Sequence, residues 1–293
     1  MDKELLIAIF GGLGAMMGWG ISDFFAKKAV DKIGHTIALF WMQSLGIIPL
    51  LIFFLLSFDT SNFSFSQMPT VVLLGVIDVM GYLMFYKALE KGKVSIISPI
   101  TASYAAFTVL ISVLVFGEHL SVKTILVLSM VFIGIILTSI DPGEFKKDGF
   151  DAKDLTKGVP EALLGVAFFS VWFPFWDNFV SDKNWLILVI LLRLVMALFL
   201  LGIGKASKLQ VRVKDPDAIK WLVIIGVLDA IAYLTLTWSY SVTRYTSIIS
   251  MLSATFSLPT LILARIFLKE KLKLNQAGGI GLILLGLSLL SLV

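Results

Sequence analysis

The sequence predicts an all-α membrane protein with ten transmembrane helices, arranged as two inverted five-helix repeats. Hydrophobic residues make up 58% of its 293 residues and charged residues only 15%, whereas a soluble domain has roughly 25% charged residues. Long apolar runs recur between short polar breaks, and the two halves of the chain resemble each other in sequence. These three observations together predict a duplicated helical membrane fold.

Each apolar run approaches the roughly 20 residues that a helix needs to cross the hydrocarbon core of a bilayer. Helices are therefore expected near residues 4–26, 36–57, 70–89, 94–116, 122–140, 159–180, 184–204, 218–240, 244–267 and 274–293. The longest polar break divides the chain into three predicted parts, which are a first five-helix repeat (1–141), a polar linker (142–157) and a second five-helix repeat (158–293).

The internal repeat emerges when one half of the chain is shifted along the other. At an offset of 152 residues Ser95–Ser98 falls on Ser247–Ser250, and at 151 the octapeptide Gly75–Tyr82 falls on Gly226–Tyr233. Five is an odd number, so the second repeat must begin on the opposite side of the membrane from the first. The halves are then related by a pseudo-two-fold axis in the membrane plane.

The distribution of basic residues predicts the orientation. Most of the 24 lysines and arginines fall in the odd-numbered connections, and the other side holds only Lys3, Lys123, Lys183 and Arg244. Lysine and arginine concentrate in cytoplasmic loops, so both termini are expected outside the cytoplasm, in a multi-pass protein of the plasma (inner) membrane. The same placement accounts for the net charge of +4 without nucleic acid as a partner.

Each copy of the repeated octapeptide carries an aspartate. Asp78 precedes Tyr82 by four residues and Asp229 precedes Tyr233 by four, so each pair shares a helix face. An aspartate at the centre of a membrane helix costs roughly 2.5 to 3.5 kcal/mol on insertion scales. Two interpretations stay open: the four side chains line or gate a central substrate site, or the aspartates only bind neighbouring helices and stabilise their assembly.

Arg193 lies in the middle of the seventh expected helix. It is a candidate counter-charge for Asp78 or Asp229, and alternatively a contact for an anionic group on a substrate. Its approximate counterpart in the second helix is Gln43, so the repeat does not duplicate this charge.

Two tryptophans and two serines complete the candidate substrate contacts. Trp19 and Trp172 are placed to form the walls of a pocket for a flat or amphipathic solute, although tryptophan also gathers at membrane interfaces. Ser98 and Ser250 coincide in the repeat, and Ser98 precedes Pro99, which can interrupt a helix and free backbone carbonyls.

The first expected helix has two further features. Gly11, Gly14 and Gly18 form a stripe of small residues, which is typical of close packing against a neighbouring helix. Asp23 and its repeat counterpart Asp177 are expected near helix ends, where we interpret both as partners in interfacial ion pairs.

Three local patterns, together with the two five-helix halves, resemble a known family. They are Gly18–Gly20 (GWG), Phe116–Leu120 (FGEHL) and Lys269–Leu272 (KEKL). On these patterns the whole chain resembles the EamA family of the drug/metabolite transporter superfamily. The resemblance implies a ten-helix basket around a central cavity that moves small metabolites such as amino acids, often outward. The chain departs from the family in two respects. Members commonly carry an arginine early in the second helix, where this chain has Gln43. Well-studied members keep both termini in the cytoplasm, whereas the distribution of basic residues here predicts both termini outside it.

The expected function is therefore that of a secondary transporter, an exporter or permease of small polar or amphipathic metabolites such as amino acids. It would work by alternating access around a midplane cavity. Its expected partners are the metabolite and the lipid bilayer, and whether a proton or another ion is coupled to transport stays open. A monomer or weak homodimer is expected, with no cofactor, no metal and no enzymatic activity. The alternatives are a passive channel or non-transporting sensor, and an intramembrane hydrolase, which needs Asp78 and Asp229 within about 5 Å of each other.

Overall fold

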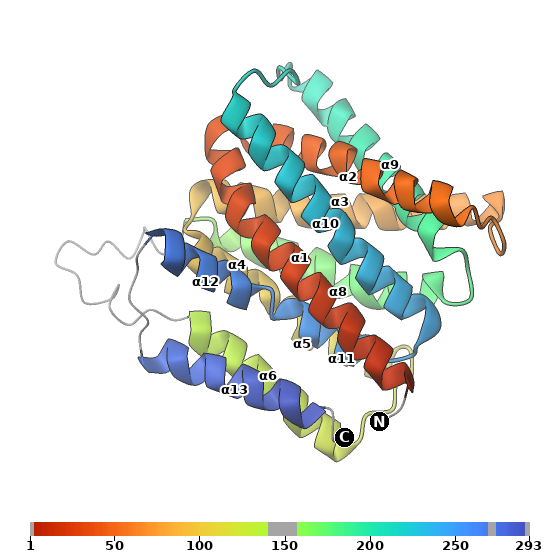
Figure 1. Ribbon diagram of the computed structural model, residues 1–293, viewed down its shortest axis with the longest axis vertical. Helices are drawn as coiled ribbons and strands as arrows, with labels where there is room; N and C mark the ends of the chain where they lie inside the picture. Colours follow the sequence, from red (N-terminus) through yellow and green to blue (C-terminus); the bar gives the residue numbers. More distant parts are fainter. Residues whose placement is uncertain (1–2, 140–156, 269–273, 291–293) are drawn as a thin grey trace.

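The computed structural model describes residues 3–139, 157–268 and 274–290, and within them it has helices, turns and loops but no strand. The helices are α1 (Lys3–Ile33), α2 (His35–Ser57), the 3-10 turn η1 (Phe65–Gln67), α3 (Met68–Lys91), α4 (Val94–Ala102), α5 (Tyr104–Leu114), α6 (Val122–Ser139), α8 (Val159–Val180), α9 (Trp185–Ala206), α10 (Pro216–Val242), α11 (Thr246–Ala254), α12 (Ser257–Leu268) and α13 (Leu274–Leu290) (Figure 1). The predicted all-α class is confirmed, and the count of ten transmembrane helices stays a prediction. The linker expected at 142–157 falls almost wholly outside the described residues, and the repeat boundaries stay a prediction.

Two segments that were expected as single helices are each broken into two. The run 94–116 is interrupted at Ser103, between α4 and α5, and the run 244–267 at Thr255, between α11 and α12. At each break a hydroxyl donates back to a carbonyl of the preceding turn, from Ser103 to Ile100 at 2.7 Å and from Thr255 to Leu252 at 2.6 Å. The same two carbonyls also accept the backbone N–H groups of Ser103 and Thr255 at 3.1 Å, so each hydroxyl adds a second hydrogen bond at its break. Both breaks occupy the same position in the repeat.

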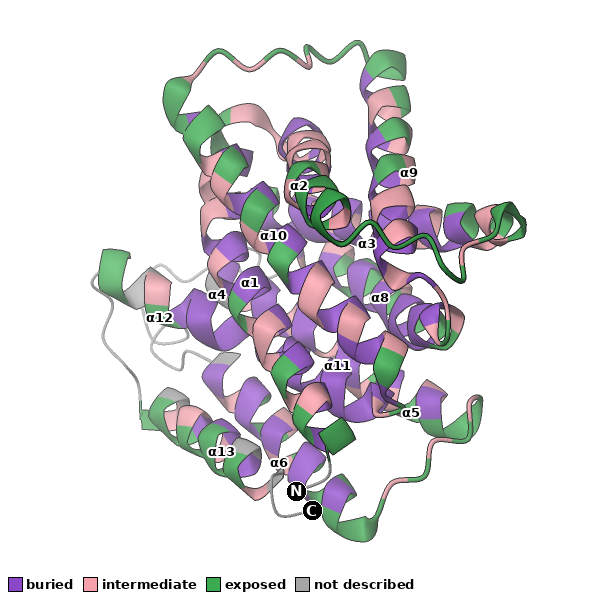
Figure 2. Cartoon of the chain, turned by 45° about the vertical axis from the view of Figure 1, so that its right-hand side comes forward, coloured by how far each residue is buried: buried purple, intermediate pink, exposed green. Residues whose placement is uncertain are grey.

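Eight segments of the described chain are long and apolar enough to cross a membrane, and α6 and α13 are shorter apolar helices. These two pack against each other at one edge of the molecule (Figure 1). Exposed apolar side chains cover the outer helices, for example Leu126 on α6 and Leu285 on α13, while buried residues gather where the inner helices meet (Figure 2). This is the distribution expected of a bundle that faces lipid.

The two repeats interlock instead of forming separate bodies. The first helix of each repeat packs along the third helix of the other, since α1 lies against α10 and α8 lies against α3 (Figure 1). The second helices, α2 and α9, also pack together. A single hydrophobic core therefore takes residues from both halves.

The glycine stripe of α1 packs closely against a neighbouring helix, as predicted, and the structure identifies that neighbour as α10. A Cβ atom on Gly18 would lie 2.7 Å from the carbonyl oxygen of Leu228, and one on Gly14 would lie 2.7 Å from Thr235 Oγ1. Only glycine allows the two backbones to approach this closely. The approach brings Trp19 of α1 next to Asp229 of α10.

Candidate functional site

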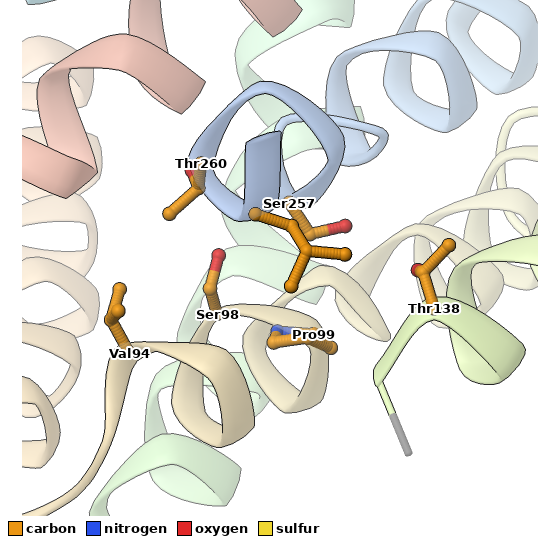
Figure 3. Close-up of a pocket in the computed structure, with 7 residues that line it drawn as sticks. Val94, Ser98, Pro99, Thr138, Ser257 and Thr260 are labelled. Carbon is orange, nitrogen blue, oxygen red and sulfur yellow. The ribbon is translucent and has the colours of Figure 1, made fainter. Parts of the chain in front are cut away.

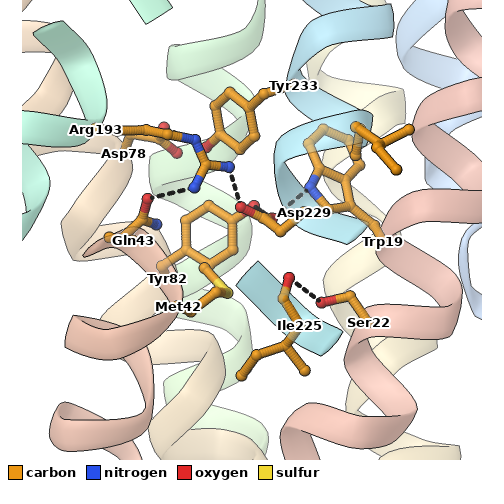
Figure 4. Close-up of polar contacts among 12 residues, drawn as sticks. Trp19, Ser22, Met42, Gln43, Asp78, Tyr82, Arg193, Ile225, Asp229 and Tyr233 are labelled. Carbon is orange, nitrogen blue, oxygen red and sulfur yellow. Dashed lines mark hydrogen bonds and ion pairs between the residues drawn. The ribbon is translucent and has the colours of Figure 1, made fainter. Parts of the chain in front are cut away.

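Asp229 is the centre of a buried polar network between α1, α3, α9 and α10 (Figure 4). Its Oδ1 accepts hydrogen bonds from Trp19 Nε1 at 2.9 Å and from the Tyr82 hydroxyl at 3.1 Å. Its Oδ2 forms an ion pair with Arg193 Nη2. All four side chains are buried, and an ionised carboxylate is stable in such surroundings only when it is paired and hydrogen-bonded in this way.

The two repeats exchange hydrogen bonds crosswise. The Tyr82 hydroxyl of the first repeat donates to Asp229 of the second, and the Tyr233 hydroxyl of the second donates to Asp78 Oδ2 of the first at 2.6 Å. Each tyrosine therefore reaches the aspartate of the opposite octapeptide. The sequence placed each pair on one helix face, but the hydrogen bonds join the two helices of the inverted repeat.

The network is asymmetric in charge. Arg193 pairs with Asp229, donates to Gln43 Oε1 at 3.1 Å, and lies over the ring of Tyr233 at 4.5 Å. Asp78 forms no ion pair among the described residues, and its Oδ1 has no hydrogen-bond partner among them. The structure thus resolves one alternative of the sequence analysis, because the counter-charge serves Asp229. Gln43, which occupies the position of Arg193 in the first repeat, contacts Arg193 itself.

A small cavity lies between the repeats beside this network, with room for about two water molecules in its 30 Å³. The first repeat supplies six of its lining residues: Trp19, Asp23, Tyr82, Phe85, Thr101 and Tyr104. The second repeat supplies three: Phe169, Phe173 and Phe256. Trp19 and Tyr82 belong to both features, since their polar atoms bind Asp229 while the residues line the cavity.

The position of Asp23 corrects an expectation. It was expected near a helix end in an interfacial ion pair, but α1 continues to Ile33 and Asp23 lies well inside it, 5% exposed, in the lining of the cavity. No described residue forms an ion pair or hydrogen bond with it. Its counterpart Asp177 accepts a hydrogen bond from Thr246 Oγ1, so the two members of this repeated pair have different surroundings.

Three of the predicted site residues make no hydrogen bond to the network and are not among the described residues that line this cavity. Trp172 nevertheless meets the ring of Tyr233 edge-on at 5.8 Å. The ring of Trp172 stacks on Trp176 at 5.6 Å, and its Nε1 has no hydrogen-bond partner in the described chain. Ser98 lines a separate cavity of about 10 Å³ between α4, α6 and α12 (Figure 3). The hydroxyl of Ser250 exchanges a 2.7 Å hydrogen bond with that of Tyr240.

The repeat contained a signal for cavity residues that sequence reasoning missed. Tyr104 and Phe256 coincide at an offset of 152 residues, directly after the two helix breaks, and both line the cavity. Trp19 and Phe173 coincide at 154, and their rings meet edge-on at 5.8 Å. Aromatic residues at matching positions of both halves, which inverted symmetry directs to one place, would have indicated this lining.

One end of α11 is held to the first repeat by Glu118. Its carboxylate accepts hydrogen bonds from the Ser247 backbone N–H at 3.1 Å and from the Ser247 hydroxyl at 2.6 Å. Burial raises the pKa of the Glu118 carboxyl, and the hydrogen bonds from Ser247 oppose that rise. A carboxylate at the first turn of a helix is favoured by the helix dipole, and here that helix is α11 of the other repeat.

Metal chemistry has no evident site in the described part of the chain, where no group of three or more His, Cys, Asp or Glu side chains is placed to hold an ion. The site contains two kinds of carboxylate. Asp23 faces a cavity lined by aromatic rings, while Asp229 nearby is bound by Trp19, Tyr82 and Arg193.

Known proteins with similar sequence or structure agree with this architecture. The chain is 23% identical over 291 residues to an uncharacterized transporter of Archaeoglobus fulgidus, a match that covers 98% of this chain and 99% of that protein. It is 34% identical over 134 residues to an uncharacterized protein of Methanocaldococcus jannaschii, and this match covers 45% of this chain but 96% of the relative. A protein known from a crystal structure has the same fold, with a TM-score of 0.77 at 15% identity over 97% of this chain and 96% of its own.

The family pattern itself occurs twice. The EamA-like transporter family matches residues 6–140 and again residues 156–292, in agreement with the two repeats expected from the sequence. The resemblance drawn from the local patterns is confirmed, and family and named relative both point to a transporter and not to an enzyme. The chain belongs to the EamA-like transporter family.

Proposed function

We propose that this protein is a secondary transporter that moves small polar or amphipathic metabolites, of about the size of amino acids, by alternating access around the cavity between its repeats. The observation that carries the proposal is that both repeats line this cavity, six residues coming from the first and three from the second. A site shared between inverted repeats can open to either side of the membrane when one repeat moves against the other.

The size of the cavity supports an occluded conformation. Its 30 Å³ is far below the roughly 300 to 1,000 Å³ of a site that binds a small molecule. Substrate entry then requires the walls to separate. The helix breaks at Ser103 and Thr255 are natural hinges for that movement, because each immediately precedes a cavity residue, Tyr104 or Phe256.

The network beside the cavity has a separate role in this proposal. Asp229, Arg193, Tyr233 and Asp78 hold the helices that form one side of the site, and Trp19 and Tyr82 connect this network to the cavity. A substrate that displaces either ring must alter the hydrogen bonds on Asp229, so substrate binding and helix movement are coupled. Trp172 supports the wall through its contact with Phe173 at 5.0 Å.

The remaining parts of the proposal concern direction and location. We infer outward transport across the plasma membrane, driven by a gradient of the solute or of a coupling ion. The excess of lysine and arginine in the odd-numbered connections supports both termini outside the cytoplasm. A reporter that fluoresces only in the cytoplasm, fused after Val293, should stay dark, and bright fluorescence would reverse the topology.

Counterflow in proteoliposomes tests the transport proposal. Vesicles that contain the purified protein are preloaded with an unlabelled solute from a panel of amines, amino acids and organic acids, and uptake of the same labelled solute is followed. A transporter gives saturable uptake above the equilibrium level, accelerated by the internal solute. Flux that rises linearly with concentration and ignores internal solute would indicate a passive channel, and no flux for any solute would favour a sensor.

A further inference from the structure

Asp23 is a buried carboxylate on α1. It is 5% exposed and lines the cavity, yet no residue in the described ranges donates a hydrogen bond to it or forms an ion pair with it. An ionised carboxylate in such surroundings is costly unless a positive charge or a proton accompanies it. Whatever compensates Asp23 therefore has to enter the cavity.

The walls of the cavity suit a positive charge. Tyr104 and Phe173 stack with their ring centroids 4.3 Å apart and their planes 7° apart, and Trp19 meets Phe173 edge-on. Phe256 completes the lining from the opposite repeat. The face of an aromatic ring carries negative partial charge, so several rings around one carboxylate form a favourable enclosure for an organic cation.

The cavity is poorly suited to bind an anion or a zwitterion. Among the described residues no lysine, arginine or histidine lines it, and the nearby Arg193 is already engaged by Asp229 and Gln43. The carboxylate of an amino acid would thus meet Asp23 without any base to offset the repulsion.

The cavity is also poorly suited to bind an inorganic cation. Such ions take several oxygen ligands at once, but five of the nine described lining residues are tryptophan or phenylalanine, which have no side-chain oxygen, and Asp23 is the single carboxylate among the nine. Asp23 is left as one carboxylate among apolar rings.

We propose that the cavity binds an organic cation with an apolar body, such as a hydrophobic amine in its protonated form, with Asp23 as the ion-pair partner and the aromatic rings as the surface for the body. This substrate class rests on the proposed transport function and deepens it. The cationic group replaces the missing partner of Asp23, while Trp19 and Phe256 contact the apolar part from the two repeats.

A matched series of probes tests the charge preference. Phenethylammonium, 2-phenylethanol, L-phenylalanine and 3-phenylpropionate share an aromatic ring on a short carbon chain and differ in charge. Binding to the purified full-length protein in nanodiscs is measured by calorimetry at neutral pH. We expect phenethylammonium to bind about tenfold or more tightly than the alcohol, and the two carboxylates to bind more weakly than either. Equal affinities for the amine and the alcohol would overturn the proposal.

Variants locate the preference. In Asp23→Asn the affinity for phenethylammonium should fall to that of 2-phenylethanol, while the affinity for the alcohol stays unchanged. Asp31→Asn is the matched control, because Asp31 lies on the same helix but is exposed and pairs with Lys27 at 2.8 Å. Phe256→Leu should reduce the preference for the amine without abolishing it. A preference that survives Asp23→Asn would refute the role of Asp23.

Folding and transport are checked separately. Asp23→Asn removes no hydrogen bond or ion pair found among the described residues, so its melting temperature should equal or exceed that of the wild type, and a large loss would assign Asp23 a structural role instead. Counterflow with the same series separates the two proposals. Saturable counterflow of phenylalanine or the alcohol, with no binding of the amine, would refute the cation site but leave transport intact. Tight binding of the amine without counterflow of any probe would support the cation site and refute the transport proposal.

Discussion

The asymmetry of the two repeated aspartates predicts that the same substitution has different costs at the two sites. Asp229→Asn removes the only ion-pair partner that the structure shows for Arg193, a side chain that is 0% exposed. Removing one member of a buried ion pair costs about 3 to 5 kcal/mol, because the other charge is left uncompensated. The neutral amide still accepts a hydrogen bond from Trp19 or Tyr82, so the loss is almost wholly electrostatic.

Asp78→Asn should be nearly neutral. The amide oxygen keeps the hydrogen bond from the Tyr233 hydroxyl, and the amide nitrogen takes the place of the Oδ1 atom that has no partner in the described chain. A single neutral hydrogen bond contributes about 1 kcal/mol, which sets the upper limit of the expected loss. The difference between the two variants is then about 2 to 5 kcal/mol.

The assay is reversible unfolding in mixed micelles by titration with a denaturing detergent, followed by tryptophan fluorescence. A double variant supplies the control: Asp229→Asn combined with Arg193→Gln removes both charges and places at 193 the residue type that Gln43 provides in the first repeat. It should recover most of the stability lost in Asp229→Asn. Equal losses for Asp78→Asn and Asp229→Asn, or no recovery in the double variant, would contradict the assigned ion pair.

Two further results are expected. Gly46→Ala should destabilise the fold by about 1 to 3 kcal/mol, because its Cβ would lie 2.2 Å from Arg193 Nη1 and Asp229 holds that guanidinium in place. Gly202 has open space around it, so Gly202→Ala is the control and should be neutral or slightly stabilising in the same titration. The hydrogen bond from Lys32 lowers the pKa of Asp215, so the wild type should be more stable than Asp215→Asn above about pH 4. That advantage should vanish as the pH falls through the lowered pKa, and a difference in melting temperature that persists in stronger acid would contradict this assignment.

Much of the architecture was predictable because its causes are local in sequence. The length of an apolar run determines whether a helix can cross a bilayer, and an odd number of helices in each repeat requires inversion. The helix breaks at Ser103 and Thr255 were not predicted, because hydropathy measures only how apolar a segment is. Their hydroxyls bond carbonyls of the preceding turn, an interaction that leaves the apolar run unchanged.

The candidate site was predictable only in part. The repeat identified Asp78, Tyr82, Asp229 and Tyr233, and the structure joins all four in crosswise hydrogen bonds. The position of Asp23 was missed because the end of the first helix was placed too early, which turned a cavity residue into an interfacial one.

Buried charge, repeat symmetry and the ten apolar segments can all be read from the order of residues, because each is a property of neighbours along the chain or of two matching stretches. The choice of partners cannot. Arg193 pairs with Asp229 and not with Asp78, and Asp23 shares its cavity with aromatic rings and with no base of the described chain, because α1, α9 and α10 pack at particular depths and rotations. Those positions follow from close helix contacts such as Gly18 against Leu228, which join residues about two hundred positions apart and arise only when the whole bundle is assembled.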